Sequence, residues 1–515
     1  MKRRIYHQKL PRAGPDREAL REKGQFWTPA WVAEAMVGYA IGGGSKSIFD
    51  PAVGAGAFFA AGKAISKQTG RKLRLLGTEL VPDVLREATK HGLKAGDLTH
   101  VKITDFVLSP PHGLIPAIVA NPPYIRHHRL TLQTKLGLKE LGTKLIGSPL
   151  DGRAGYHVYF LLRALQLLAT DGRLAFIMPA DTCEGVFSQK LWKWITTNYR
   201  LDAVITFAPD ASPFPGVDTN PIIFLIRKSK PAANLFWARC LKPDTNDLKR
   251  WTLSGFRKTN AKSVSVHYRN IDEGVITGLS RPPFRKHRNG PFLKDYARTL
   301  RGIATGANDF FFLTTQQASD LHIPSTFLRP AIGRTRDVSG DEITDKTLKE
   351  LELKQIPTLL FSPDGRPLES FPEPVRDYIR QGESLELHKR ALIASRRPWY
   401  KMEVRKIPPF LFAYLGRRNA RFIKNTAGIL PLTGFLCVYP LQENPDYLVK
   451  LWAVLNHPQT IKNLKLVGKT YGSGAIKVEP RALENLPIPL SVLDAVSLPR
   501  PNKPQQLQFK LLASL

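Results

Sequence analysis

Residues 114–124 read LIPAIVANPPY. The apolar run 114–120 ends at a polar residue and two prolines, which predicts a buried strand that stops at an open sheet edge. The prolines fix the backbone and remove two N–H donors, so the Asn121 side chain and the Pro122 carbonyl are held as hydrogen-bond acceptors. Tyr124 adds a flat face for a planar ring. The stretch therefore predicts a cradle for a ring with an exocyclic amine, such as a nucleobase; the alternative is a proline-stiffened loop beneath a tyrosine.

A strand, a glycine turn and the start of a helix are expected upstream, where residues 47–58 read SIFDPAVGAGAF. Glycines in such a turn let the backbone approach a ligand closely at the carboxyl edge of a parallel sheet. A second strand at 73–77 leads to Glu79, at about the 20-residue distance from which an acidic side chain reaches ribose hydroxyls. The ligand-facing residues expected in the first turn are Asp50, Pro51, Gly54, Gly56 and Phe58.

Three more positions belong to the same predicted edge. Asp105 follows a third strand and is placed to accept from an adenine amine, with Phe106 packed against the ring. Thr28 is expected to cap a helix whose free N–H groups face an anion, although an ordinary helix cap is an equally good interpretation. A single carboxylate here would more simply be a solvated loop residue. Three acidic strand ends in one βαβ series, ahead of the Asn-Pro-Pro-Tyr turn, favour a binding site instead.

The periodicity predicts two domains. An amphipathic helix at 156–169 and strands at 173–179, 201–207 and 222–226 continue the α/β pattern, and the last two strands suit an antiparallel hairpin at the sheet edge. The remaining segments are short, aromatic and punctuated by proline, which predicts a mixed α+β domain. The expected boundaries are a flexible basic arm at 1–23, the α/β domain at 24–239, the second domain at 240–497 and a loosely ordered tail at 498–515.

The charge balance points to a polyanionic partner. The chain has 515 residues and a formal net charge of +33, from 76 Lys and Arg against 43 Asp and Glu. A basic but merely soluble surface is the alternative. The excess extends over both halves, through Lys135, Lys139, Lys144, Arg334, Arg336, Arg396, Arg397, Arg417, Arg418 and Arg421.

Composition also narrows the protein class. Only three widely spaced cysteines occur, without a CxxC or Cys/His pairing, so neither a disulfide framework nor a metal site is expected. No apolar run of about 18 residues occurs, so neither secretion nor membrane spanning is expected. We therefore expect a cytoplasmic, DNA-associated protein from a bacterium or archaeon.

Two glycine-bearing stretches of the second domain carry polar side chains beside aromatic ones. Residues 300–311 read LRGIATGANDFF and residues 471–480 read YGSGAIKVEP. Tight turns of this kind suit a phosphate backbone, whereas each glycine taken singly favours a structural bend. The expected contacts are Arg301, Gly302, Thr305 and Lys477.

In order along the chain, these motifs resemble those of the gamma group of N6-adenine DNA methyltransferases. The stretch 121–126 and the two stretches of the second domain point more closely to the AccI/Eco57I-type modification enzymes, which are similar to the TaqI methyltransferase in their first domain. The resemblance covers about residues 24–490. It implies a class I, Rossmann-like methyltransferase sheet followed by a target-recognition domain.

The resemblance also implies roles for individual residues. S-adenosylmethionine would lie among the upstream motifs, and the target adenine in duplex DNA would be held by Asn121, Pro122 and Tyr124. Pro123 lies beside them, Arg126 is interpreted as a phosphate contact, and Phe207 or Phe214 would close the other face of the base. The residues implied around the cofactor are Thr28, Asp50, Gly54, Gly56, Glu79, Asp105 and Phe106.

Site-specific methylation of adenine N6 is thus the expected activity, by a monomer on DNA that serves a restriction-modification or related defence system. A cognate restriction endonuclease is the further partner that this setting implies. Alternatives are methylation of protein glutamine or cytosine N4, or a DNA-binding specificity module without catalysis. One departure is that residues 154–157 read AGYH, where family members often carry an acidic residue.

Overall fold

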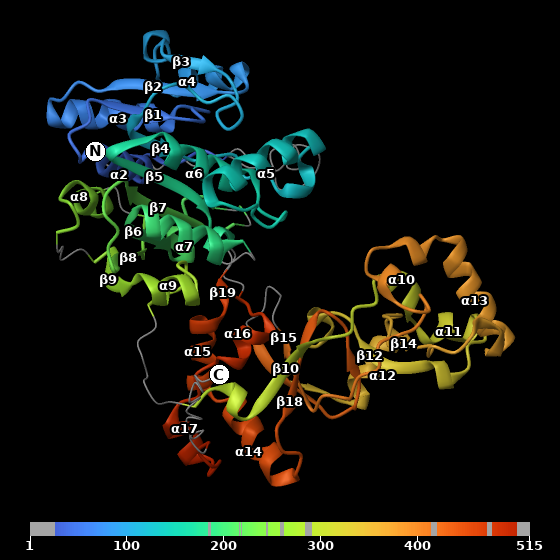
Figure 1. Cartoon of the computed structure of the whole chain (residues 1–515). Coiled ribbons are helices and arrows are strands. Elements are labelled where there is room, and N and C mark those ends of the chain that lie inside the picture. The colour runs from blue at the N-terminus through green and yellow to red at the C-terminus, as the bar shows by residue number, and fades with distance from the viewer. Residues whose placement is uncertain are drawn as a thin grey trace, which may run out of the picture. The chain divides into compact units, whose positions relative to one another are not determined.

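The protein is described here from a computed structural model, in which two compact units are resolved (Figure 1). The units comprise residues 1–284 with 471–473, and residues 285–470 with 474–515. The expected arm at 1–23 lies outside the described residues. The structure describes residues 26–183, 187–215, 217, 219–243, 246–257, 262–283, 291–413, 420–470 and 476–501, without the side chains of 465, 469, 470, 476 and 477.

The first unit is built on a nine-stranded sheet with the order β3-β2-β1-β4-β5-β7-β6-β8-β9. Strands β1 to β5 pair in parallel, as expected for a βαβ series, and β7 runs antiparallel between β5 and β6. The strands are β1 Ser47–Asp50, β2 Arg74–Glu79, β3 Val101–Ile103, β4 Ile115–Ala120, β5 Leu168–Pro179, β6 Arg200–Phe207, β7 Pro221–Arg227, β8 Asn234–Cys240 and β9 Val264–Asn270.

Helices cover both faces of this sheet because its central strands are apolar on both sides. In β4, Ile118 and Ala120 face the core beneath α5, α6 and α7, whereas Ala117 and Val119 face the core beneath α2, α3 and α8. The helices of the unit are α2 Ala30–Ile41, α3 Ala57–Thr69, α4 Leu85–Lys90, α5 Leu132–Ile146, α6 Tyr156–Leu167, α7 Ser188–Asn198, α8 Asp247–Leu253 and α9 Ile271–Thr277.

The expected hairpin forms, but it does not lie at the edge of the sheet. Strands β6 and β7 pair antiparallel, yet β6 also pairs in parallel with β8, and β9 pairs antiparallel with β8. Their hydrogen bonds extend the first unit well past the predicted end at residue 239. The boundary predicted near residue 240 was therefore too early.

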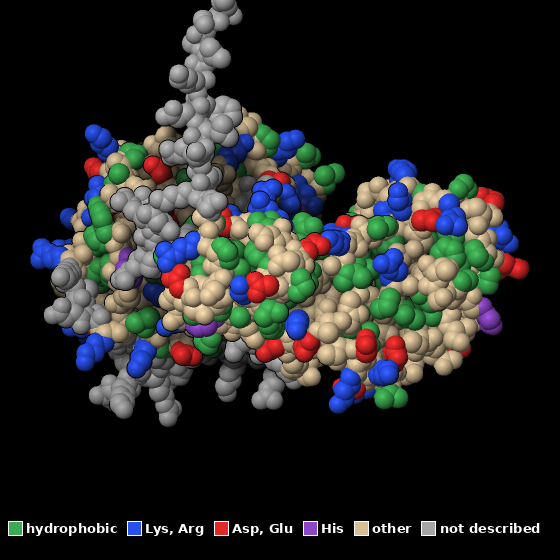
Figure 2. All heavy atoms as spheres, turned by 90° about the horizontal axis from the view of Figure 1, so that it is seen from below, with side chains coloured by type: hydrophobic (Ala, Val, Ile, Leu, Met, Phe, Trp, Pro, Cys, Tyr) green, Lys and Arg blue, Asp and Glu red, His purple; other side chains and the backbone are tan. Residues whose placement is uncertain are grey.

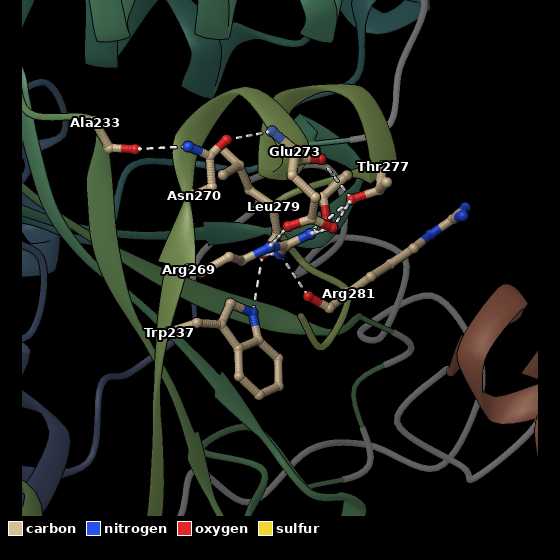
Figure 3. Close-up of polar contacts among 9 residues, drawn as sticks. Ala233, Trp237, Arg269, Asn270, Glu273, Thr277, Leu279 and Arg281 are labelled. Atoms are coloured by element: carbon tan, nitrogen blue, oxygen red, sulfur yellow. Dashed lines mark hydrogen bonds and ion pairs between the residues drawn. The ribbon is translucent and has the colours of Figure 1, made fainter. Parts of the chain in front are cut away.

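Arg269 holds the end of this unit together (Figure 3). Its guanidinium is buried, forms an ion pair with Glu273 (Nε to Oε2, 2.7 Å), and donates to the carbonyl oxygen of Arg281 at 2.6 Å. Trp237 on β8 donates from Nε1 to the carbonyl oxygen of Leu279 at 3.1 Å. The segment after α9 is thereby fixed to the sheet, which explains why the unit continues beyond β9.

The second unit contains two larger sheets of short strands. A five-stranded sheet has the order β10-β18-β15-β16-β13, and a four-stranded sheet has the order β11-β14-β12-β17. A two-stranded ribbon, β19 (Lys469–Thr470) with β20 (Ile476–Lys477), is separate. The strands of the larger sheets are β10 Ala297–Arg301, β11 Phe312–Leu313, β12 Leu328–Ile332, β13 Glu342–Ile343, β14 Leu359–Phe361, β15 Phe410–Ala413, β16 Arg421–Asn425, β17 Leu430–Pro431 and β18 Phe435–Pro440.

Separate apolar cores stabilise the sheets of the second unit. Helices α14 to α17 pack on one face of the five-stranded sheet through residues such as Leu451, Leu464 and Leu493, and α13 packs over the four-stranded sheet through Val375 and Ile379. The helices are α10 Asn308–Phe311, α11 Thr315–Asp320, α12 Asp345–Leu353, α13 Glu373–Ser384, α14 Pro445–Leu455, α15 Pro458–Val467, α16 Pro480–Glu484 and α17 Leu490–Ala495.

The start of the predicted tail is packed. Leu498 is buried in the core beneath α17, the Pro499 carbonyl accepts from the Tyr296 hydroxyl, and Arg500 forms an ion pair with Asp494. The predicted start of a loosely ordered tail at residue 498 is therefore too early in the chain. Residues 502–515 lie outside the described residues. Within the described parts of the chain, every helix is too short or too polar to cross a lipid bilayer.

Candidate active site

A cavity opens at the carboxyl edge of β1, β2 and β4. The open space within it is about 1080 Å³, a figure that includes solvent at the mouth. Asn121 and Pro123 share its wall with residues of the first three strand ends, so the cavity extends as far as the Asn-Pro-Pro-Tyr turn. The predicted cofactor residues that line it are Thr28, Asp50, Pro51, Gly54, Phe58, Glu79, Asp105 and Phe106.

Asp50 places a buried carboxyl group in the cavity wall. Its Oδ1 accepts from the Ala52 N–H at 3.0 Å, while Oδ2 is buried and has no hydrogen-bond partner among the described residues. Burial, with a smaller contribution from the negative charge of Glu79, raises the pKa of Asp50 to about 8. An unpaired acidic oxygen on a cavity wall is suited to a cationic ligand.

Glu79 ties the glycine turn to the second strand. Its Oε2 accepts from the Gly54 N–H at 2.8 Å, and its Oε1 accepts from the N–H groups of Leu80 and Val81. Gly54 has a positive φ of 53°, a conformation that glycine adopts without strain. Since each carboxylate oxygen accepts more than one hydrogen bond, Glu79 can hold the turn and also accept from a ligand hydroxyl.

Gly56 has a packing role and is not part of the cavity wall. Its φ is 77°, and a Cβ atom at this position would lie 2.3 Å from Leu93 Cδ1. The residue thus permits close packing of the α3 start against the 88–93 segment. Its contact with a ligand stays a prediction, since the neighbouring residues 54, 55, 57 and 58 line the cavity.

Asp105 is held by Tyr156 from the start of α6. The tyrosine hydroxyl lies 2.9 and 2.8 Å from the two carboxylate oxygens, and the N–H groups of Val107 and Leu108 also donate to Oδ1. Tyr156 lines the cavity and occupies the region where sequence comparison noted a missing acidic residue. The sequence analysis did not assign Tyr156 to the site. The missing acidic residue at 154–157 was the feature that could have pointed to it.

The Phe106 ring packs in an aromatic cluster at the cavity wall. Phe106 is only 1% exposed and packs between Phe49 and Phe160, with ring centroids 5.9 and 5.4 Å away. The expected packing of Phe106 against a bound ring stays a prediction, since the residue also lines the cavity. Its side chain forms the floor of the site.

The amide of Asn121 has a defined direction. Its Nδ2 donates to the Phe26 carbonyl oxygen at 2.6 Å and to Thr28 Oγ1 at 3.1 Å. Because both N–H groups are used, Oδ1 is the atom left to accept from a ligand. Residues 26–28, which we call the strap, therefore orient the side chain.

Thr28 thus has a role other than the one predicted. Pro29 is the N-cap of α2, and no side chain caps this helix. Thr28 is buried and lines the cavity, but its hydroxyl oxygen accepts from Asn121 and does not serve a helix end. The first residues of the described chain contribute directly to the candidate catalytic group.

Tyr124 lies within an aromatic cluster. Its ring centroid is 5.8 Å from that of Phe26, and Phe26 in turn lies 6.0 Å from Phe214. The Tyr124 hydroxyl donates to the Ile177 carbonyl oxygen at 3.1 Å, and burial raises its pKa well above the usual value. Phe207 packs instead against Trp31 on α2. Of the two phenylalanines predicted to face the base, the structure brings Phe214 into this cluster, through Phe26.

The predicted contacts of the second unit have structural partners. A Cβ atom on Gly302 would lie 2.1 Å from the Leu432 carbonyl oxygen, so this glycine permits two backbones to cross. Thr305 is buried, with its hydroxyl hydrogen-bonded to Asn308 Oδ1 and to the Ala307 N–H. Arg301 is exposed but paired with Glu479. Gly302 and Thr305 are therefore unsuited to phosphate contact, while the Lys477 side chain lies outside the described residues.

The arginines of the second unit differ in environment. Arg334 and Arg336 are exposed, whereas Arg396 donates to the carbonyl oxygens of Ala304 and Thr305. Burial lowers the pKa of Arg396. Figure 2 shows Lys and Arg side chains scattered over the visible face with acidic side chains among them. Arg417 and Arg418 lie outside the described residues.

Two family models match the chain, one over most of each unit. Residues 8–246 match the family described as N-6 DNA Methylase. Residues 283–507 match the C-terminal domain of type II methyltransferase M.Eco57I. The chain thus combines an N6-adenine DNA methylase domain with an Eco57I-type C-terminal domain. Methyl transfer to adenine N6 in DNA is accordingly the activity of this methyltransferase, and S-adenosylmethionine is its methyl donor.

Individual relatives extend over most of this methyltransferase. It is 25% identical over 487 residues to type II methyltransferase M.AccI of Acinetobacter calcoaceticus, covering 93% of this chain and 87% of that protein. It is 26% identical over 480 residues to type II methyltransferase M.XamI of Xanthomonas campestris pv. amaranthicola, covering 90% of this chain and 85% of that protein.

A solved structure shares the fold of the methyltransferase. The type IIL restriction-modification enzyme MmeI, determined in complex with DNA, superposes with a TM-score of 0.51 at 11% identity. The match covers 89% of this chain and 65% of that chain. At this identity the likeness concerns the fold alone.

The cavity fits S-adenosylmethionine. Its wall carries the unpartnered buried oxygen of Asp50 for a cation and the Glu79 carboxylate for hydroxyl groups. The Asp105 carboxylate, held by Tyr156, is a further acceptor on an otherwise largely apolar wall. A sulfonium nucleoside presents this combination of groups.

Proposed function

We propose that this methyltransferase modifies one adenine within a specific duplex DNA site, after that base has left the helix. The observation that carries the proposal is the orientation of Asn121, whose two N–H groups are taken by the strap. The Oδ1 atom and the adjacent Pro122 carbonyl are then the two acceptors for the target amine. Asn121, Pro122 and Tyr124 are the residues to which we assign the catalytic role.

These two acceptors would make the adenine amine a better nucleophile. The lone pair of the adenine amine is delocalised into the ring, which makes the nitrogen a weak nucleophile. Hydrogen bonds from its two N–H groups to Asn121 Oδ1 and to the Pro122 carbonyl would localise the lone pair on nitrogen. Bound S-adenosylmethionine supplies an electrophilic methyl group. After transfer, the nitrogen must lose one proton to solvent to become neutral N6-methyladenine.

The target base must be extruded from the duplex, at a cost of a few kcal/mol. Tyr124 is half-buried and lies in the aromatic cluster with Phe26 and Phe214, so stacking on it would return part of this cost. Pro123 lines the cavity beside Asn121 and keeps the turn rigid. We assign to Arg126, which is exposed just beyond the turn, a contact with a flanking phosphate.

The cofactor would be held by the remaining residues of the cavity. Asp50 would pair with positive charge, Glu79 would accept from the ribose, and Asp105 would accept from the adenine amine of the cofactor. Trp27 and Val81 add apolar wall. Sequence reasoning missed both because neither belongs to a charged or glycine-bearing motif.

Asn121→Ala tests the catalytic assignment. The variant should lose methyl transfer by several orders of magnitude, since it removes an acceptor that is used most strongly in the transition state. Incorporation of tritiated methyl groups into plasmid DNA measures the loss. Asn121→Asp should fall between wild type and Asn121→Ala, because it keeps an acceptor but sets a second oxygen against the Phe26 carbonyl.

Calorimetric titration of S-adenosylmethionine into the same variants is the control. Its affinity should change little for Asn121→Ala, because we place this side chain against the amine of the substrate. Transfer by Asn121→Ala within about tenfold of wild type would remove Asn121 from the mechanism. Loss of cofactor binding in step with transfer would instead place Asn121 in the cofactor site.

We further propose that the second unit reads the DNA sequence and that the enzyme acts as a monomer that protects the sites of a cognate restriction endonuclease. The two larger sheets and the exposed arginines of the second unit belong to a different part of the chain from the cavity of the first unit. This separation suits an enzyme in which one unit carries out methyl transfer and the other reads the sequence. Long-read mapping of N6-methyladenine in cells that express the chain would identify the site. Methylation without sequence preference would contradict the proposal.

A further inference from the structure

Helix α5 (Leu132–Ile146) follows the Asn-Pro-Pro-Tyr turn almost at once in the chain. A short helical turn at His127–Arg129 separates them, and Thr131 caps α5 by accepting the Thr134 N–H. Leu138 and Leu141 bury one side of the helix in the core that it shares with α6. Figure 1 shows α5 beside α6 in the first unit. The helix is thus firmly attached near the catalytic turn.

The opposite side of α5 is apolar and exposed. Leu132 is 75% exposed and Leu136 is 60% exposed, and their four-residue spacing places them one above the other on the helix surface. None of the residues of the first unit that the structure describes covers them. Two large aliphatic side chains in water at one end of a helix are suited to contact with another molecule.

Positive charge surrounds these leucines. Lys135 and Lys139 are exposed on the same side of the helix, and neither forms an ion pair with any residue that the structure describes. Arg126 is exposed at the start of the connecting segment, and Lys144 at the end of the helix. Glu140 is the only acidic residue of α5. This charge complements the phosphates of DNA and opposes association with another basic copy of the chain.

We propose that the exposed side of α5 is a DNA-binding surface of the catalytic unit, on which Lys135 and Lys139 bind phosphates and Leu132 and Leu136 enter the duplex beside the target adenine. This inference rests on the proposed function, because extrusion of a base leaves a gap in the stack. Apolar side chains that insert between base steps stabilise such distorted DNA. The helix follows the turn that receives the base, so its first residues are placed to fill the gap.

The leucines are tested with Leu132→Ser combined with Leu136→Ser. The probe is a short duplex with the site found by methylation mapping, carrying 2-aminopurine at the target adenine. Wild type should raise the 2-aminopurine fluorescence as the base leaves the stack. The double variant should lower this signal. On the same duplex with adenine at the target, which can accept the methyl group, it should reduce kcat/KM by about tenfold, while its affinity for S-adenosylmethionine is unchanged.

Ile276→Ser is the matched control. Ile276 lies on α9 of the same unit and is also 75% exposed, so its replacement removes an equally exposed aliphatic side chain. The control should leave both fluorescence and kcat/KM unchanged. Equal behaviour of the leucine double variant and this control would overturn the role of the leucines.

The lysines are tested by salt dependence. Lys135→Ala with Lys139→Ala should reduce the slope of log affinity against log salt by about two, because each phosphate contact contributes about 0.9 to it. Lys67→Ala on α3 serves as the control, since α3 packs on the other face of the sheet. An unchanged slope for the double lysine variant would overturn the phosphate contacts.

Two further results separate this inference from the function on which it rests. Methylation by wild type without any rise in 2-aminopurine fluorescence would refute base extrusion and, with it, the insertion of the leucines. A change of mass in sedimentation, with DNA affinity and fluorescence unaffected by the α5 variants, would show that a second copy of the chain occupies this surface and would overturn the proposal.

Discussion

Thr28 connects the beginning of the described chain to the catalytic turn. Its Oγ1 accepts one of the two Asn121 N–H groups, and the other N–H donates to the Phe26 carbonyl. A threonine before a proline predicts a helix cap, and nothing local indicates that its hydroxyl serves a side chain far along the chain. The sequence predicted that Thr28 and Asn121 belong to one site, and both line the same cavity. It did not predict the hydrogen bond between them.

Thr28→Val should lower the rate of transfer by about fivefold, which corresponds to one hydrogen bond of about 1 kcal/mol. Valine keeps the shape of the side chain but no longer accepts from Asn121, so the amide is held by the Phe26 carbonyl alone. Single-turnover rates with saturating cofactor measure the effect. In the Asn121→Ala background the same replacement should have almost no further effect, whereas additive losses would show that Thr28 acts elsewhere.

We predict that Asp50 makes cofactor affinity dependent on pH. Its pKa of about 8 means that the carboxyl group of the cofactor-free protein is largely protonated at pH 7. A cationic ligand favours the charged carboxylate, so binding must release a proton below pH 8. The affinity for S-adenosylmethionine should therefore rise with pH by up to about tenfold per unit and level off above about pH 8.

Asp50→Asn is the control for this pH dependence. The amide has a similar shape but no charge, so binding to the variant should be weaker and should lose the part of the pH dependence that arises from residue 50. Calorimetry in buffers of different ionisation enthalpy counts the released protons directly. A wild-type affinity that falls as pH rises from 6 to 8 would contradict the assignment of Asp50 to a cation.

At the scale of elements, the strand ends were predictable because each leaves a local signature. An apolar run followed by Asp50, Glu79 or Asn121 predicts both a strand and the edge at which it ends, and the structure has all three at the cavity. The additional strands β8 and β9 were not predictable in the same way. Strands and helices alternate here too, as β8, α8, β9 and α9, but the sequence carries no clear periodic pattern for them. Their place in the first sheet depends on pairing between segments and on buried polar contacts such as those of Arg269.

Arg269→Leu should destabilise the first unit by about 3–5 kcal/mol, because it leaves Glu273 without its ion pair and several buried carbonyl oxygens without a donor. Urea unfolding, followed by the fluorescence of tryptophans such as Trp237, measures the loss. Lys294→Leu in the second unit, an exposed position, is a control that should have little effect. Equal stability of wild type and Arg269→Leu would show that β9 and α9 are held by apolar packing alone.

For the whole molecule, the net charge of +33 predicts that DNA affinity depends strongly on salt. Arg334→Ala should flatten the slope of log affinity against log salt by about one, because Arg334 is exposed in the second unit. Filter binding to the mapped duplex over a range of salt concentrations measures the slope. A slope equal to that of wild type would remove Arg334 from the phosphate contacts.

Arg396→Ala is the counterpart of that variant. The Arg396 guanidinium holds two backbone carbonyl oxygens and lies 5.5 Å from the centre of the Phe311 ring, so its loss should lower stability and leave the salt slope unchanged. In a sequence the two arginines look alike, as basic residues of a basic domain. Burial distinguishes them, and burial in the second unit depends on packing between short segments that have no periodic signal.

Gly302 illustrates the same limit. A glycine between an arginine and an apolar residue predicts a turn that faces a ligand, but the structure uses it where two backbones cross. The first unit was more predictable because its function lies at strand ends, which the sequence marks. In the second unit only the general character of the domain, mixed and basic, could be predicted.

The strap lies at the beginning of the described chain and Asn121 at the end of the fourth strand, yet the chemistry requires only that they meet. The order in which the two segments are encoded is therefore free to change. A circularly permuted gene that placed residues 26–41 after the sheet would preserve the same carbonyl and hydroxyl beside the amide. Deletion of residues 1–28 would keep every strand and remove the groups that direct the Asn121 oxygen toward its substrate.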